Sequence, residues 1–458
     1  PTFKNELEPD LEKHGLKYIW ADDHITGHPN FEGQGIIVYK DVDKTCDSIA
    51  EYSKNDAKRY REIYEEFEEV KDGVVAAMFS PPSPPSYVFQ ALENNSEGLR
   101  RLRDYQLSSR AFTLKNFENP HVRAFILGWA MAPQTLPDQE ATAQGFYVMI
   151  PSIHVFGESI PEGGSGMLCE AMKSYIEANG GSVMTGAAVD KFIIENNECR
   201  GVRLADNTDI LATRAVVSGL DPQQTFLRCM EEHEVDPRIR SIVENFSFGN
   251  VTIARAHYAL HEPPVFNNGP DMSATPFQRI FGSIADIDKQ YNEIAAGLAP
   301  TDPFLWSACW TLKDPARAPD GKHTMIMDTF VPVDLASGED WEKIGPAYVR
   351  DVLLRNLRRH TSNMSDDNIM AEYIDTGPQL ARDNWSFVNG TTTGGERILS
   401  QLGSFRPIPG FAEYKSPVVN LYMTGPSCHP GGGISAMGTN TANVMLQDFG
   451  LKEPQDSF

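Results

Sequence analysis

The stretch GPSCHPGGGISAMGTNTANVM, from Gly425 to Met445, decides what kind of fold this chain can adopt. It follows an apolar run, VVNLYM, so the expected order is strand, glycine turn and helix. In an open α/β sheet, ligands bind beyond the carboxyl ends of the strands, which is where Gly425 and the run Gly431 to Gly433 fall. Glycine permits backbone conformations and close approaches that are barred to other residues. The pattern predicts a ligand close to the backbone here, with an ordinary loop as the alternative.

Two further features of this stretch bear on chemistry. The N-terminus of the following helix can stabilise negative charge on a ring carbonyl. His429 has two interpretations: a proton donor or acceptor beside a ring system, or a positioning histidine bonded to backbone. Small side chains allow this helix to pack closely against its surroundings, namely Ser435, Ala436, Gly438 and Ala442.

A second glycine-rich segment, PEGGSGMLCEAM, runs from Pro161 to Met172. Gly163, Gly164 and Gly166 lie before and at the start of an expected helix over residues 166–179. Free backbone N–H groups and the positive end of the helix dipole suit an anion or a polarised carbonyl at this place. The alternative is a flexible loop before a helix.

A run of short β segments follows this helix. SVMT, DKFIIE, CRGVRLA and DILATRAVVS are expected strands, separated by turns at Asn196-Asn197 and Asp206-Asn207. A tight meander of this kind can lay its backbone against an adenine ring, with Val189 bonding through its main chain. A plain surface hairpin is the alternative.

Composition limits the possible partners and location. The 458 residues carry 63 acidic against 40 basic side chains, a formal net charge of −23, so nucleic acid is not an expected partner. No apolar run reaches the roughly 18 residues of a membrane span, and the charged start lacks a secretion signal. Six cysteines without a CxxC pair fit a reducing compartment, so we expect the cytoplasm or an organelle matrix. No metal site is expected, because His257 and His261 have no evident third ligand.

The texture of the chain suggests two discontinuous domains. Residues 1–156 are mostly helical, with an amphipathic helix from about Ala57 to Val74 capped near Ser53. Residues 249–385 alternate strands such as VTIARAHYAL with helices such as GPAYVRDVLLRNLRRH. The glycine-rich turns fall in residues 157–248 and 386–458. We therefore assign the latter pair of segments to a cofactor domain and the former pair to an α+β substrate domain.

The order of these motifs resembles a known family. PEGGSGMLCEAM, VDKFIIENNECRGVRLADN, AVVSGLDP, DPARAPDGKHT, LGSFRPIPG and LYMTGPSCHPGGG together resemble the phytoene-desaturase-like branch of the FAD-dependent amine-oxidase superfamily, and most of all its pyridine nucleotide-disulphide oxidoreductase domain proteins. The resemblance runs from about Leu7 to Gly450. It implies an α/β fold in which a Rossmann-like FAD domain is interleaved with the substrate domain.

The resemblance also implies roles for particular residues. Val189 would touch the adenine, and Gly425 would approach the pyrophosphate or ribityl chain. Gly432, Gly433 and Ile434 would lie near the pyrimidine edge of the flavin. The complete set of expected FAD-binding residues is Gly163, Gly164, Val189, Gly425, Pro430, Gly431, Gly432, Gly433 and Ile434; His429 is the one weak catalytic candidate.

Two departures from the family stand out. Thr439 precedes Asn440 where the family often has arginine, so we expect a salt contact to be missing here. The larger departure is that the 458 residues contain no strand–GxGxxG–helix unit, so the FAD domain is N-terminally incomplete by a βαβ unit of roughly 30 residues. We expect a separate N-terminal segment to complete the FAD site, and weak FAD retention without one.

The expected activity is that of an FAD-dependent oxidoreductase of the desaturase, dehydrogenase or oxidase type. Hydride would move from a substrate C–H bond to flavin N5, since the cofactor carries the chemistry. The expected substrate is a small apolar or alicyclic molecule. Two alternatives remain: a non-catalytic binding protein on the same fold, similar to Rab GDP-dissociation inhibitors, and an inactive fragment that needs a partner segment.

Overall fold

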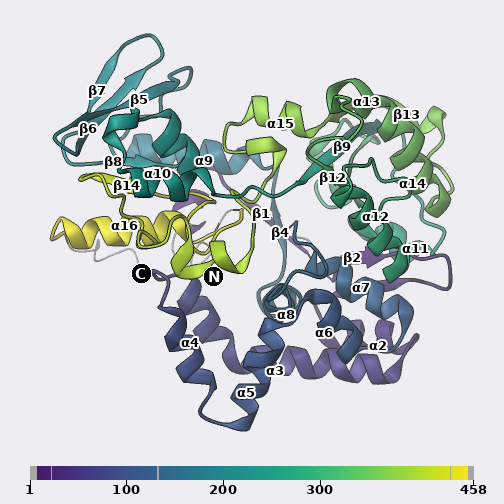
Figure 1. The fold of residues 1–458 in the computed structure, drawn as a ribbon. Coiled ribbons are helices and arrows are strands. Elements are labelled where there is room, and N and C mark those ends of the chain that lie inside the picture. The colour runs from purple at the N-terminus through teal and green to yellow at the C-terminus, as the bar shows by residue number, and fades with distance from the viewer. Residues whose placement is uncertain (1–7, 22, 132–133, 434, 452–458) are drawn as a thin grey trace.

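A computed structural model describes residues 8–21, 23–131, 134–433 and 435–451 of the chain. Figure 1 shows a large sheet with its helices on one side of the molecule, a smaller α/β region on the other and a layer of helices beneath them. No helix in the described ranges is both long and apolar enough to cross a membrane.

A seven-stranded sheet forms the centre of the larger part. Its order is β13-β9-β12-β11-β10-β2-β3, antiparallel throughout except for the parallel pair β10 and β2. The expected strand VTIARAHYAL is confirmed as β9, whose outer half alternates buried and half-buried residues. The strands span His24–His28 (β2), Ile36–Tyr39 (β3), Val251–Leu260 (β9), Phe277–Ile280 (β10), Leu305–Ala308 (β11), His323–Pro332 (β12) and Ile369–Asp375 (β13).

One face of this sheet is apolar and packs against helices. Tyr258 and Met327 point from neighbouring strands into a core closed by Trp341 and Leu353. The helix expected over residues 345–360 is one continuous helical run with a π-helical middle, made of α13 (Trp341–Tyr348), η6 (Val349–Leu354) and α14 (Arg355–His360). The other face is apolar at one end, where Ile253 and Phe330 join a second core, and polar further along, where Arg255 donates to Asp328.

The N-terminal helices form a layer beneath the sheet. The expected amphipathic helix is α3 (Lys54–Met78), capped by the Ser53 hydroxyl, which accepts a bond from the Asp56 N–H. Phe112 and Phe125 anchor its apolar side in a shared core. The other helices of the layer are α2 (Val42–Ala50), α4 (Pro85–Leu92), α5 (Ser96–Gln106), α6 (Ser109–Asn116), α7 (Pro120–Ala130) and α8 (Gln144–Phe156).

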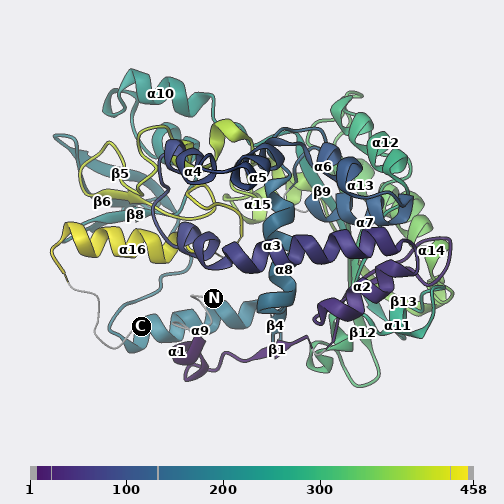
Figure 2. The same ribbon diagram turned by 90° about the horizontal axis from the view of Figure 1, so that it is seen from below.

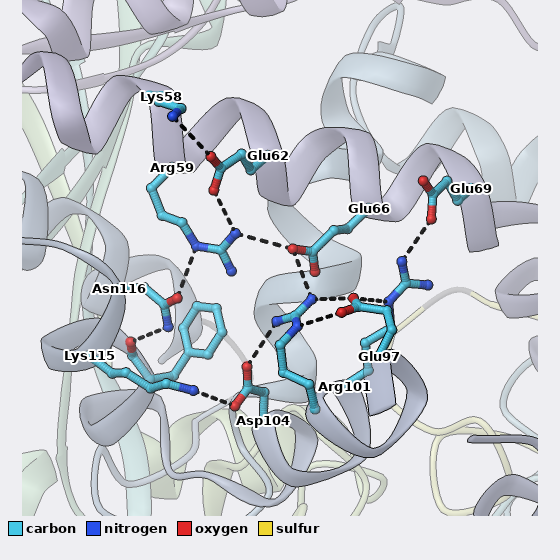
Figure 3. A network of polar contacts seen from close by, with 12 residues as sticks. Lys58, Arg59, Glu62, Glu66, Glu69, Glu97, Arg101, Asp104, Lys115 and Asn116 are labelled. Atoms are coloured by element: carbon cyan, nitrogen blue, oxygen red, sulfur yellow. Dashed lines mark hydrogen bonds and ion pairs between the residues drawn. The ribbon is translucent and has the colours of Figure 1, made fainter. Parts of the chain in front are cut away.

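A network of charges fastens α5 and α6 to α3 (Figure 3). Arg100 bonds Glu66 of α3 and Asp104 of its own helix, both at 3.1 Å. Lys115 of α6 donates to the other oxygen of Asp104 at 2.6 Å. The Asp104 side chain is 1% exposed, so it needs these partners, because a buried unpaired carboxylate is costly.

The smaller part contains the expected meander, β5 (Val189–Glu195), β6 (Glu198–Leu204) and β7 (Asp209–Leu211), beside a parallel pair, β8 (Val216–Ser218) and β14 (Leu421–Met423). The expectation that SVMT forms a strand is wrong. Residues 182–185 pair with no described strand, and Val183 and Met184 are 38% and 62% exposed. An extended segment without a neighbouring strand has no ladder to join.

Helices flank the smaller part, and two short strands connect it to the larger one. Leu11 and Leu16 pack on Leu168 of α9 (Gly166–Ala178), so residues 8–16, assigned to the substrate domain from the sequence, lie against a helix of the expected cofactor domain. The remaining elements are α1 (Glu8–Glu12), β1 (Tyr18–Trp20), β4 (Ser159–Pro161), α9 (Gly166–Ala178), η2 (Gln224–Arg228), α10 (Pro237–Glu244), α11 (Pro270–Ala274), α12 (Ile284–Ala295), α15 (Gly377–Asp383) and α16 (Met437–Asp448), with short 3₁₀ turns between them.

Candidate functional site

The carboxyl ends of β8 and β14 meet directly before the glycine turn. The Thr424 N–H donates to the Ser218 carbonyl at 2.8 Å, which continues the parallel ladder. Gly425 has a φ of +89°, and a β-carbon on it would lie 2.9 Å from the Gly219 carbonyl oxygen. Only glycine fits this approach of two strand ends. The predicted position of Gly425, at the carboxyl end of a parallel strand, therefore matches the structure.

The three consecutive glycines differ in what lies beside them. Gly431 and Gly432 have φ values of +82° and +85°. A β-carbon on Gly431 would lie 2.8 Å from Arg406 Nε, and one on Gly432 would lie 2.9 Å from Arg397 Nη1. A β-carbon on Gly433 would meet nothing within 4 Å. Two glycines thus admit guanidinium groups and the third faces open space; Ile434 lies outside the described residues.

Arg406 is fully buried and is held without a carboxylate. Its Nη atoms donate to five backbone carbonyls, those of Thr393, Gly394, Glu396, Gln401 and Pro426, at 2.9–3.4 Å. Its Nε, beside Gly431, has no partner among the described residues. Burial lowers the pKa of Arg406 to about 10, and the nearby charge of Arg397 contributes to the lowering.

Arg397 lies against the same turn. Burial lowers its pKa, and no hydrogen bond or ion pair joins it to another described residue. The helix α16 begins close by at Met437, and its N-cap residue, Ala436, offers no capping side chain, so the first N–H groups of the helix add positive potential. The turn is thus positively polarised although the chain as a whole is strongly acidic.

His429 is occupied by backbone. Its Nε2 lies 3.0 Å from the Ala77 carbonyl at the end of α3, so Nε2 carries the proton and donates. The His429 carbonyl accepts from the Tyr414 hydroxyl at 2.9 Å. Burial lowers the pKa of the imidazole. This arrangement suits the positioning interpretation of His429 and places Pro430 directly at the entry of the turn.

The PEGGSG turn already holds a carboxylate of the chain itself. The Gly163 N–H donates to Asp314 Oδ2 at 2.7 Å, and Arg317 Nε donates to the same oxygen at 2.8 Å. Burial raises the pKa of Asp314, but the bonds from Arg317 and Gly163 outweigh it, so the pKa is lowered. Gly164, with a φ of +111°, has open space around it. No hydrogen bond between described residues links this turn to residues 431–433.

Val189 opens β5 and is half-buried, opposite Leu204 in the meander. The Ala188 carbonyl accepts from the Ala205 N–H at 2.9 Å, which closes the start of the hairpin. Val189 therefore lies where a strand begins, as expected from the sequence. No described contact joins it to either glycine turn.

The polar face of the large sheet carries a row of side chains that could not be grouped from the sequence. Register aligns Arg279, Trp306 and Asp328 on neighbouring strands, and Arg255 follows, donating to Asp328 at 2.9 Å. Arg279 is 7% exposed and stacks on the Trp129 ring at 3.6 Å. No described residue bonds Arg279 Nε and Nη1, Trp306 Nε1 or Asp328 Oδ1. No composition or spacing signal could have aligned these four strands.

A cavity of 510 Å³ lies beside this row. Its walls include His257, Trp310 and Tyr373, with Ser165 and Arg317 from around the PEGGSG turn. His257 Nε2 lies 3.1 Å from Asp375 Oδ2. Trp310 lines this cavity, and so does Tyr258, which is also part of the buried core. The described residues contain no cluster of three or more metal-ligating side chains.

Comparisons with known proteins agree with this architecture. No protein-family model matches the chain. It is 25% identical to one of the subunits of limonene dehydrogenase from Castellaniella defragrans, over 96% of this chain and 83% of that protein. It is 23% identical to pyridine nucleotide-disulfide oxidoreductase domain-containing protein 2 of Mus musculus, over 98% and 83%. A putrescine oxidase structure superimposes with a TM-score of 0.55 at 12% identity, over 96% of this chain and 84% of that one.

These likenesses confirm the resemblance found in the sequence. The chain has the α/β fold of the FAD-dependent amine-oxidase and desaturase superfamily. The relatives are named as dehydrogenases and oxidoreductases, and the chain resembles them over nearly its whole length. The comparisons do not favour the alternative of a non-catalytic binding protein.

Proposed function

We propose that the protein is a dehydrogenase or desaturase that removes hydrogen from a small apolar or alicyclic molecule. The observation that carries the proposal is the glycine turn at the carboxyl ends of β8 and β14, where Gly433 faces open space and Arg397 lacks a counter-charge among the described residues. Bound FAD would supply the chemistry by accepting a hydride from a substrate C–H bond, and loss of a proton from the neighbouring C–H, N–H or O–H group would leave C=C, C=N or C=O.

The described residues fit one end of this cofactor. Gly432, Gly433 and Arg397 would hold the ring system, because they combine open space with hydrogen-bond donors and positive charge. The described residues do not offer a comparable site for the diphosphate end, because the Gly163 N–H already donates to Asp314. The sequence offers no GxGxxG turn in its place. We therefore propose that a segment outside these 458 residues, in cis or as a separate chain, completes the diphosphate site.

The substrate would bind at the polar face of the large sheet. Its 510 Å³ cavity lies within the usual range for small-molecule sites and has Trp310 and Tyr373 as aromatic walls. A relative named limonene dehydrogenase supports an alicyclic substrate. We accordingly propose residues 157–248 and 386–458 as the FAD domain, and residues 1–156 and 249–385 as the substrate domain.

An anaerobic reduction assay tests this function. The chain is reconstituted with FAD, with and without an added strand–GxGxxG–helix segment, and mixed with alicyclic alkenes, alcohols and amines. Loss of the oxidised-flavin absorbance together with formation of an oxidised product is the expected result. If dithionite bleaches the flavin and no member of the panel does so, the proposed substrate class is wrong.

A further inference from the structure

Arg397 and Arg406 place two positive charges at the glycine turn without an acidic partner among the described residues. Arg317, by contrast, is paired with Asp314 at 2.8 Å. Glu396, the acid next in sequence to Arg397, is turned away, because its Oε2 accepts from the Ser247 hydroxyl at 2.6 Å. The charge at the turn is therefore not compensated by the described part of the protein.

The two arginines differ in how far their positive charge is compensated by hydrogen-bond acceptors. Arg406 compensates with five backbone carbonyls, and its unpaired Nε faces Gly431. Arg397 has no such carbonyl cage in the described ranges and shares its surroundings with Arg406, whose charge repels it. Arg397 is half-buried, and even partial burial of a guanidinium without protein partners is unfavourable. A ligand oxygen that carries negative charge would remove the penalty.

Arg406 also fixes where Arg397 lies. It binds the carbonyls of Thr393, Gly394 and Glu396 on one side and that of Pro426 on the other. The segment that carries Arg397 is thereby tied to the segment that enters the glycine turn. Arg397 is thus held at a defined position, 2.9 Å from the place a Gly432 β-carbon would take.

Resting on the function proposed above, we infer that Arg397 is a positioning residue that donates a hydrogen bond to a pyrimidine-edge carbonyl oxygen of the bound flavin. Arg406 supports it from behind, and the N-terminus of α16 adds positive potential on the same side. Reduction places negative charge on this end of the ring system. The guanidinium therefore stabilises the reduced cofactor and makes the ring more electrophilic.

A phosphate of FAD is the other anionic group that could meet Arg397, and three ligands separate the two sources. Lumiflavin has the ring without phosphate, ADP has the phosphates without the ring, and FAD has both. Binding of each to the 458-residue chain is measured by fluorescence quenching or calorimetry. Arg397→Leu is compared with Arg397→Lys and with Arg238→Leu, which removes an exposed arginine on α10.

We expect Arg397→Leu to weaken lumiflavin and FAD by about ten- to hundredfold, the usual worth of a charge-assisted hydrogen bond, and to leave ADP unchanged. Arg397→Lys should recover part of the loss, and Arg238→Leu should match the unaltered chain. The sulfite affinity of the bound flavin should fall with the same substitution, because sulfite adds to an electron-poor ring.

Three results would overturn the inference. Unchanged lumiflavin and FAD affinities in Arg397→Leu would show that Arg397 does not contact the ring. A loss confined to ADP and FAD would assign Arg397 to a phosphate. If the unaltered chain binds neither lumiflavin nor FAD, the flavin assignment itself fails, and the proposed function fails with it.

Discussion

Replacing Gly433, the third glycine of the turn, tests whether this position leaves room for a ligand or is required for the stability of the fold. Gly433→Val should leave the ligand-free protein as stable as before, because Gly433 is exposed, its φ lies outside the left-handed region and its β-carbon meets nothing within 4 Å. Such a surface change is usually worth at most about 0.5 kcal/mol. The valine side chain would instead fill the open space that we assign to the flavin, so flavin binding should be lost.

Gly431→Ala is the matched comparison, because a substitution in the same turn should here lower the stability of the ligand-free protein. A left-handed φ of +82° costs a non-glycine residue about 1–2 kcal/mol. The new β-carbon would also lie 2.8 Å from Arg406 Nε and disturb at least one charge-assisted bond, worth about 1.5–3 kcal/mol. A total of about 2.5–5 kcal/mol predicts a Tm lower by about 5–20 °C for a cooperative unit of about 150–250 residues.

Differential scanning fluorimetry and the flavin-to-protein absorbance ratio measure the two effects on the same samples. The expected pattern is a normal Tm without flavin binding for Gly433→Val, and a lowered Tm for Gly431→Ala. A Gly433→Val protein that binds flavin normally would refute the assignment of the turn. A Tm loss equal to that of Gly431→Ala would show that Gly433 serves packing.

Three further predictions concern charge. Asp314→Asn should destabilise the protein by about 1–3 kcal/mol at pH 7; because the folded pKa of Asp314 is lowered, this difference should shrink as pH falls below about 3.8, and urea titrations at several pH values would measure it. Burial lowers the pKa of His360 to about 4, so the neutral ring is favoured on folding and stability should fall by about 3 kcal/mol between pH 6.5 and 4; a His360→Phe variant that keeps the full slope would contradict this. With a net charge of −23, the chain should not bind heparin at physiological salt, which a heparin column would test.

Local periodicity in the sequence predicted individual helices and strands correctly. Strand β9 and helix α3 were predicted because their alternation and their 3.6-residue spacing are properties of one segment. The segment SVMT failed because its residues favour a strand but no described strand lies beside it. Propensity sets what a segment can form, and pairing decides whether it does.

Contacts between distant segments account for what the sequence missed in the site. The glycine run predicted a close approach, but not that Arg406 and Arg397, from 25 and 35 residues earlier, would be the groups beside it. In the same way, Asp314 reaches Gly163 across 151 positions of the chain. Neither pair has a local signature, so only the folded arrangement identifies which glycine serves packing and which leaves room.

The end of helix α3 gives the molecule a mechanical connection between its two parts. At one end of α3, Asp56 accepts from the Glu118 and Asn119 N–H groups within the helical layer. At the other end, the carbonyls of Ala77 and Met78 accept from His429 and Asn440 beside the glycine turn (Figure 2). A helix of 25 residues is about 37 Å long, so α3 acts as a strut of fixed length. Any movement of one part relative to the other must either carry α3 along or break its bonds to His429 and Asn440. The last turn of α3 is therefore the point at which a shift of the helical layer would reach the glycine turn.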